Sequence, residues 1–319
     1  MRKKIACLFI ILSILTLLTA CGPAATHTTG KPSIVCTIFP SYDWMREILG
    51  DRINDVDLTL LANNGVDLHS YQPTADDIIR ISTCDMLIYV GGTSDAWVED
   101  ALKTTSRTDM IVIKLMDVLG SAIKEEELQE GMEHDHDEEH GELDEHVWLS
   151  IKHAKTLCTH MASKLMEMDA SNRSVYEQNT NAYTEKLSEL DEQYHIATTQ
   201  GTQHTLLFAD RFPFRYLVDD YGLDYYAAFA GCSAETEASF ETIVFLAHKV
   251  DELNLGKIMV VETSDQSIAQ TVRQNTNAKD QEILVMDSMQ SVNQQAMDHG
   301  ITYLSIMQEN LKVFVEAVK

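Results

Sequence analysis

Eight short apolar runs constrain the fold of this chain more than any other feature of its sequence. Four lie in the first half, at 33–38, 56–61, 86–90 and 110–115, and four in the second, at 205–209, 225–229, 257–261 and 282–286. Helical patterns lie between them. Near-continuous apolar runs that alternate with helices are typical of parallel sheets covered on both faces. We therefore expect an α/β protein with two lobes, each a parallel sheet of about four strands with flanking helices.

A long helical stretch, 171–200, lies between the two sets of runs. Its larger side chains recur at intervals of seven, four, three and four residues, which places them on one helical stripe: Tyr176, Tyr183, Leu187, Leu190 and Tyr194. We expect one rigid linker helix between a first lobe at 32–170 and a second lobe at 201–319. The alternative is an ordinary surface helix of the second lobe.

The first twenty residues have the features of a secretory signal peptide. A basic head precedes an apolar run of 14 residues, Ile5 to Leu18, which is shorter than the roughly 20 residues of a membrane span. The tetrapeptide that ends at Cys21 resembles a bacterial lipobox, which implies cleavage before Cys21 and attachment of lipid to its sulfur. Residues 21–31 would then be a flexible tether on the extracytoplasmic face of the cell membrane. Ordinary cleavage near Ala20, with Cys21 left free, is the alternative.

The charge balance restricts the partners of the chain. It has 24 Lys and Arg against 50 Asp and Glu, a formal net charge of −26. Such a chain is a poor candidate for binding nucleic acid or for electrostatic docking onto anionic lipid, and its field attracts cations. We expect no nucleic-acid partner, contact with the membrane through the lipid anchor alone, and a monomer.

Four ionisable residues stand next to apolar runs, two in each half. His69, Asp210 and Asp287 come after such runs, and His146 comes directly before the run at 147–149. Ligands of open α/β sheets bind at the carboxyl ends of the strands, so these four side chains could meet between the lobes. Imidazoles with carboxylates form a ligand set for zinc or manganese. Taken singly, each aspartate could instead cap a helix, and each histidine could be an ordinary buried residue.

Two of these residues stand in motifs that resemble a known family. Residues 65–74 (GVDLHSYQPT) resemble the motif GxDPHxYEP(S/T), and residues 144–149 (DEHVWL) resemble DPHxWL, of the zinc- and manganese-binding receptors of bacterial ABC importers. The similarity extends from about residue 33 to the end of the chain. It implies two lobes joined by a helix and a bound divalent metal, with His69 and His146 as its first two ligands and Asp287 as its last.

The resemblance does not settle which residue of this chain would be the third metal ligand. Counting back from Tyr221 places Arg211 there, and arginine cannot ligate a metal because it stays protonated. Asp210, one residue earlier, is the preferred candidate. Weaker candidates are Cys232, which could supply a thiolate, and Glu262, which could equally serve the interface between the lobes.

An acidic segment at 125–145 precedes His146. Glu125 to His146 contains 12 acidic residues and 4 histidines in 22 residues, with no Lys or Arg, so it cannot bury a core. We expect a mobile loop on the first lobe. His134, His136 and His140 could capture zinc there and pass it to the rigid site, or the loop could simply be a solvated acidic segment. The loop favours zinc over manganese as the ligand.

The resemblance implies a receptor that delivers a metal ion to an ABC permease and catalyses no covalent reaction. No phosphate-binding GxxxxGK[ST], GxSxG or HExxH motif is present in the sequence. Two alternatives remain: a secreted zinc metallohydrolase, for which Glu262 is the candidate base, and an adhesin that holds metal for structure. Disulfides among Cys36, Cys84, Cys158 and Cys232 are permitted outside the cell, but burial as small apolar residues is favoured.

Overall fold

The computed structural model describes residues 30–132, 143–233 and 237–319, of which residues 33–319 form one unit. The predicted signal peptide, the lipidation site Cys21 and the loop histidines His134, His136 and His140 lie outside the described residues. Within the described ranges, no helix combines the length and the apolar character needed to cross a lipid bilayer.

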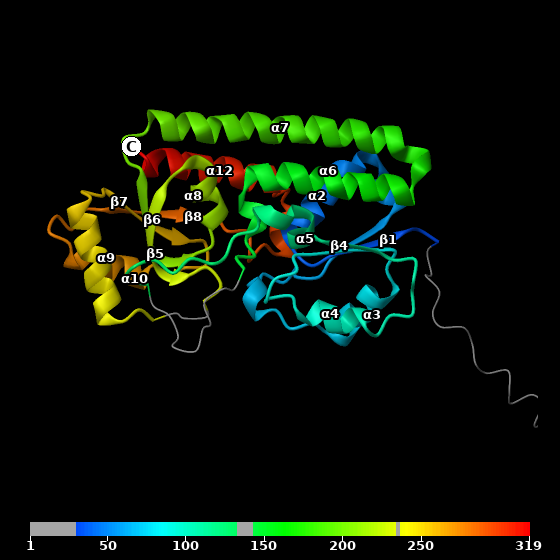
Figure 1. Ribbon diagram of the computed structural model, residues 1–319, viewed down its shortest axis with the longest axis horizontal. Helices are drawn as coiled ribbons and strands as arrows, with labels where there is room; N and C mark the ends of the chain where they lie inside the picture. Colours follow the sequence, from blue (N-terminus) through cyan, green and yellow to red (C-terminus); the bar gives the residue numbers. More distant parts are fainter. Residues whose placement is uncertain (1–29, 133–142, 234–236) are drawn as a thin grey trace, which may run out of the picture. The chain divides into compact units, whose positions relative to one another are not determined.

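The first sheet is parallel, with the strand order β2-β1-β3-β4. Its strands are β1 (Ser33–Cys36), β2 (Asp57–Leu60), β3 (Met86–Tyr89) and β4 (Ile111–Lys114). Its helices are α2 (Phe39–Leu49), α3 (Ala75–Thr83), α4 (Trp97–Leu102), α5 (Leu115–Leu119) and α6 (Ile151–Met168). Every residue of β1 and β3 is buried, because α3 and α4 cover one face and α2 and α6 the other (Figure 1).

The second sheet is also parallel, with the order β6-β5-β7-β8. Its strands are β5 (Thr205–Phe212), β6 (Asp224–Ala230), β7 (Lys257–Val261) and β8 (Glu282–Met286). Its helices are α8 (Arg215–Tyr221), α9 (Phe240–Glu252), α10 (Ser267–Asn275), α11 (Gln294–Asp298) and α12 (Tyr303–Ala317). The eight strands predicted from the apolar runs are thus confirmed, and so is the α/β class with two four-stranded sheets.

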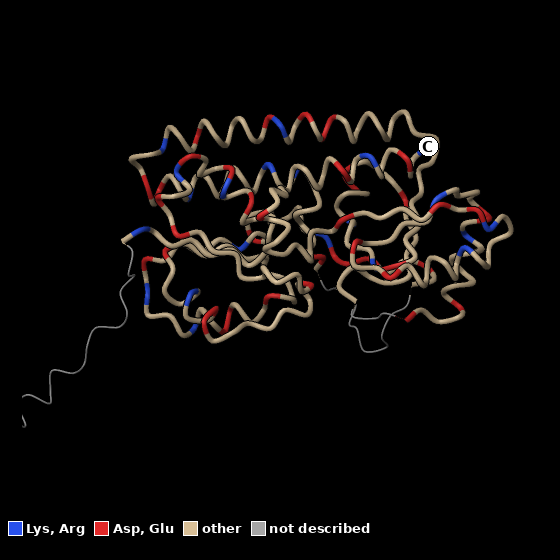
Figure 2. The backbone as a smooth tube through the Cα atoms, turned by 180° about the vertical axis from the view of Figure 1, so that it is seen from behind, with Lys and Arg blue, Asp and Glu red and all other residues tan. Residues whose placement is uncertain are grey.

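One long helix, α7 (Arg173–Gln200), extends over both sheets (Figures 1 and 2). The predicted stripe is buried: Tyr176, Tyr183, Leu187, Leu190 and Tyr194 are at most 2% exposed. They belong to one hydrophobic core that continues from Ile34 and Ile88 of the first sheet to Phe208 and Val261 of the second. A shared core of this kind restricts movement of one sheet relative to the other.

A buried carboxylate connects α2 with the end of the chain. Asp43 is 1% exposed, and its Oδ2 accepts a hydrogen bond of 2.8 Å from the backbone N–H of Tyr303 in α12. Burial raises the pKa of Asp43 to about 6, although the Tyr303 N–H and the Arg46 guanidinium lower it in part. The folded chain therefore binds this proton more tightly than the unfolded chain does.

This carboxyl group predicts a specific pH dependence. Stability contributed by Asp43 is lost as the pH rises from about 4 to about 6, by up to about 3 kcal/mol. Asp43→Asn removes the titration, so the difference in stability between variant and wild type should shift in favour of the variant over this range. Urea unfolding at a series of pH values measures it. Parallel pH profiles for the two proteins would contradict the assignment.

The cysteines of the described chain are all free. Cys36, Cys84 and Cys158 are buried, as expected for small apolar residues, whereas Cys232 is partly exposed.

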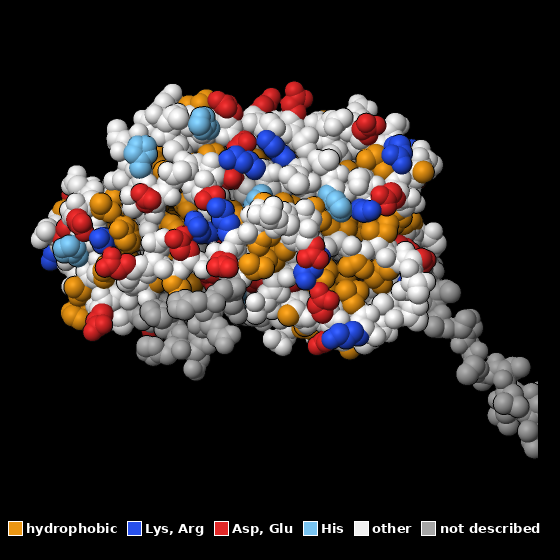
Figure 3. Space-filling model, in the orientation of Figure 1, with side chains coloured by type: hydrophobic (Ala, Val, Ile, Leu, Met, Phe, Trp, Pro, Cys, Tyr) orange, Lys and Arg blue, Asp and Glu red, His pale blue; other side chains and the backbone are white. Residues whose placement is uncertain are grey.

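On the face of the molecule drawn in Figure 3, the Lys and Arg side chains are interspersed with Asp and Glu side chains.

Candidate metal centre

His69 is held by the loop that follows β2. It lies in a single turn of 3-10 helix, Leu68–Ser70, whose first backbone N–H groups are capped by Asp67: the Oδ1 of Asp67 accepts a 3.0 Å hydrogen bond from the His69 N–H. The Nδ1 of the His69 ring contacts the Ser94 hydroxyl and lies 3.1 Å from the Oε1 of Glu145. A carboxylate at this distance accepts the Nδ1 proton, which leaves the lone pair on Nε2.

His146 is oriented in the same way by its own neighbour. The ring is fully buried, and its Nδ1 lies 3.0 Å from the Oδ1 of Asp144, which also accepts the backbone N–H of His146. Burial by itself lowers the pKa of His146, but the Asp144 carboxylate outweighs it and raises the pKa above its usual value. A carboxylate behind a ligating imidazole fixes its tautomer and increases its basicity.

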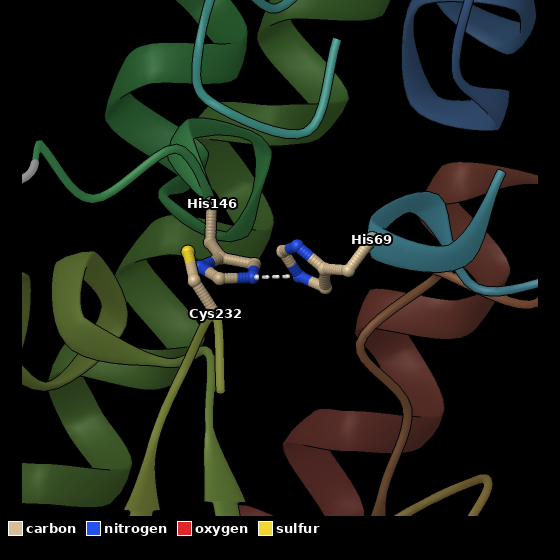
Figure 4. A group of neighbouring side chains, drawn as sticks. All are labelled: His69, His146 and Cys232. Carbon is tan, nitrogen blue, oxygen red and sulfur yellow. Dashed lines mark hydrogen bonds between the residues drawn. The ribbon is translucent and has the colours of Figure 1, made fainter. Parts of the chain in front are cut away.

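The two rings face each other through their Nε2 atoms, which are 3.3 Å apart (Figure 4). Because both Nδ1 atoms are held by carboxylates, both Nε2 lone pairs point at the same place. A third side chain that could ligate a metal lies near the two rings: the Sγ of Cys232 and one nitrogen of each histidine all lie within 4.8 Å of one another. This group joins the loop after β2, the turn before α6 and the turn after β6.

Glu145 supports both sides of the group. It is 1% exposed, accepts from the Ser94 hydroxyl and the Ser94 N–H, and lies 3.6 Å from the Cys232 Sγ. Burial by itself raises its pKa, but the His69 hydrogen bond, the nearby His146 and Ser94 lower it to about 2. The centre thus contains a fixed negative charge that does not itself face the paired Nε2 atoms.

Asp210 lines the same cavity as His69, but its carboxylate makes other contacts. Its oxygens accept the backbone N–H groups of Arg211, at 2.8 Å, and Val261, at 3.4 Å. It lines a cavity of about 560 Å³ together with His69, Asp67 and Arg211. The Arg211 guanidinium donates a 2.7 Å hydrogen bond to the Oδ2 of Asp67. Burial raises the pKa of Asp67, but Arg211 outweighs this effect and lowers it overall.

Asp287 and Glu262 organise the turn after β8. The Oδ1 of Asp287 accepts the Met289 N–H at 2.7 Å, and Glu262 accepts the N–H and hydroxyl of Ser288. Burial and the neighbouring Glu262 raise the pKa of Asp287 to about 7. Of the four residues first expected to converge, the structure therefore brings the two histidines into contact, whereas both aspartates engage backbone N–H groups nearby.

The turn after β8 also places Gln290 against the histidines. With its amide oriented so that the nitrogen faces Asp67, that nitrogen lies 3.3 Å from the His69 Nε2, and the oxygen lies 3.1 Å from the His146 Nε2. Gln290 is 8% exposed. No sequence motif predicted that Gln290 would lie beside the histidines. Glu145 could have been found, because it stands next to His146 where the resembled motif has proline.

Gly231 allows the second half to approach His146 closely. A Cβ at this position would lie 2.9 Å from the His146 Cε1 and 2.8 Å from the Phe212 carbonyl oxygen. Gly231→Ala should therefore displace the His146 ring and weaken zinc binding by about 10-fold or more. The matched control is Gly256→Ala, because a Cβ at Gly256 would meet no atom within 4 Å. Competition titration of both variants tests this, and equal affinities would contradict it.

Two parallel sheets under one long helix, with paired histidines held for a cation, define a metal-binding protein of the two-lobed, helix-linked class. The chain belongs to the family described as "Zinc-uptake complex component A periplasmic", which residues 34–317 match. This confirms the resemblance inferred from the motifs at His69 and His146.

Individual relatives agree with the family assignment. The chain is 32% identical over 313 residues to the zinc-binding lipoprotein AdcA of Streptococcus pneumoniae. The alignment includes 97% of this chain but only 60% of the length of that relative. It is 29% identical to the high-affinity zinc uptake system protein ZnuA of Bacillus subtilis, over 100% of this chain and 99% of the relative. The crystal structure of the Zn(II)-bound ZnuA-like domain of S. pneumoniae AdcA aligns with a TM-score of 0.72 and 27% identity, covering 91% of this chain and 99% of that domain.

Proposed function

We propose that the protein is an extracytoplasmic receptor that captures a divalent transition metal, with zinc preferred and manganese second, and delivers it to an ABC permease. The observation that carries this proposal is the pair of Nε2 atoms 3.3 Å apart, each backed by a carboxylate. Two neutral imidazoles with converging lone pairs bind a cation such as zinc. The relatives named for zinc binding and zinc uptake support the choice of metal.

The remaining parts of the proposal concern ligands and location. His69 and His146 are the proposed ligands from the first half, with a carboxylate of Asp210 or Asp287 from the second. Each aspartate would turn away from its present backbone partner to reach the ion. Cys21 is the proposed lipid attachment site, residues 21–31 the tether, and the protein acts as a monomer. The proposed lobe boundaries are 32–170 and 201–319, with the linker helix at 171–200.

Under this proposal, the protein binds and releases a metal ion and catalyses no reaction. A coordination shell filled by protein ligands leaves little room for the activated water of a catalytic zinc site. The shared core under α7 should keep the chain folded without the ion, as a receptor that binds and releases metal requires. A protein that holds metal only for structure would instead unfold when the metal is removed.

Metal analysis with competition titration tests the proposed function. The purified protein should bind one equivalent of zinc reversibly and more tightly than manganese. The metal-free form should keep its far-ultraviolet circular dichroism spectrum and a cooperative unfolding transition. Hydrolytic turnover by the zinc-loaded protein, or unfolding on removal of zinc, would overturn the proposal in favour of a metallohydrolase or a structural metal site.

A further inference from the structure

Cys232 differs from the other described cysteines in its surroundings. Cys36, Cys84 and Cys158 are buried in the hydrophobic cores, whereas Cys232 follows β6 and points toward His146 (Figure 4). Its Sγ is within 4.8 Å of a nitrogen of both histidines. Within the described chain, no other His, Cys, Asp or Glu of the second half joins this group.

The backbone around Cys232 is built to keep the sulfur at that place. The Cys232 N–H donates a 2.9 Å hydrogen bond to the Oε1 of Glu126, across 106 residues. Gly231, which directly precedes Cys232, lies against the His146 ring. The Glu145 carboxylate contacts both the Cys232 Sγ and the His69 Nδ1, and so ties the two elements together.

The charge around the sulfur favours a cation. Two carboxylates lie close to Cys232: the Oε1 of Glu145 is 3.6 Å from its Sγ, and the Oε1 of Glu126 accepts its backbone N–H. The same two carboxylates attract a divalent ion, and an ion bound at the sulfur displaces the thiol proton. These two carboxylates therefore favour a cation bound at the sulfur.

Arg211 cannot be the third ligand of the ion, whereas Cys232 can. It occupies the position where the family resemblance places a third ligand, and its guanidinium has no lone pair and is bound to Asp67 at 2.7 Å. We infer that the Cys232 thiolate is the third ligand of the ion, beside His69 and His146, with one carboxylate completing the shell. This inference rests on the proposed function and deepens it.

A thiolate ligand defines the class of ion that the site accepts. Sulfur ligands select zinc and softer ions such as cadmium, whereas manganese prefers carboxylate and water oxygens. The site should therefore discriminate against manganese through Cys232 itself. With Cys232→Ser, which replaces the sulfur by a hydroxyl, zinc affinity should fall by at least about 10-fold while manganese affinity changes little.

Cobalt substitution tests the inference by spectroscopy. The Co(II)-loaded wild-type protein should show a thiolate-to-cobalt charge-transfer band in the near ultraviolet. The band should be absent in Cys232→Ser and Cys232→Ala. It should persist in Cys84→Ala, which removes a buried sulfur that does not belong to the group of His69, His146 and Cys232. Circular dichroism of each variant reports whether it is folded.

The outcomes separate this inference from the proposed function. A charge-transfer band that depends on Cys232, together with a reduced preference for zinc over manganese in Cys232→Ser, supports the inference. If wild-type protein binds Co(II) and zinc without such a band, the thiolate ligand is disproved, while metal binding that depends on His69 leaves the proposed function standing. If neither metal binds at all, both fail together.

Discussion

Replacing either paired histidine should abolish high-affinity zinc binding. His69→Ala and His146→Ala each remove one of the two Nε2 atoms that face each other at 3.3 Å. Loss of a group that merely orients a ligand typically costs 10- to 100-fold in metal affinity, so loss of the ligand itself should cost more than about 100-fold. Isothermal titration or competition with a chromogenic chelator measures the effect on the purified variants.

An exposed histidine supplies the control for this prediction. His195 lies on the exposed face of α7, so His195→Ala should bind zinc with wild-type affinity and stoichiometry. Both site variants should remain folded in their metal-free forms, because the hydrophobic core shared under α7 keeps all its apolar side chains in each. One equivalent of zinc bound by His69→Ala as tightly as by wild type would show that the ion lies elsewhere.

The largest loss of stability should come from Trp148→Ala. The side chain is 1% exposed, its Nε1 donates a 2.8 Å hydrogen bond to the Ser288 carbonyl oxygen, and its ring packs edge-on against His146 at 5.3 Å between centroids. Truncating a buried tryptophan leaves a large cavity, so the free energy of unfolding should fall by about 3–5 kcal/mol. Urea unfolding followed by far-ultraviolet circular dichroism measures this difference.

Trp148→Phe separates packing from hydrogen bonding. It keeps most of the aromatic volume and leaves the Ser288 carbonyl without the indole donor, so it should lose only about 1–2 kcal/mol. Because the indole joins the turn before α6 to the turn after β8, Trp148→Ala should also weaken zinc binding. Equal stabilities for the two variants would mean that the cavity is filled by rearrangement.

The strands and the long helix could be predicted because their patterns are local. Apolar runs bounded by turn residues located all eight strands, and the spacing from Tyr176 to Tyr194 identified the buried face of α7. The order of strands in each sheet depends on contacts between distant segments, and apolar runs alone do not encode it. The continuous core under α7 likewise depends on how the two sheets share that helix.

The site was predictable only where a motif marks it. The motifs at His69 and His146 led to the two facing imidazoles. Asp67 of the first motif caps the backbone turn that carries His69, and Asp144 of the second holds the His146 Nδ1. The contributions of the second half depend on where separate turns meet. Gln290 lies in a turn held by Glu262, and no sequence pattern places its amide at the histidines. Asp210 and Asp287 therefore remain predicted ligands.

The most direct test of the account is the position of zinc in crystals of the loaded protein. Anomalous scattering at the zinc absorption edge should give one strong peak between the two rings, about 2.0–2.1 Å from each Nε2 of His69 and His146. A principal peak away from this pair, with the two imidazoles still in mutual contact, would contradict the account.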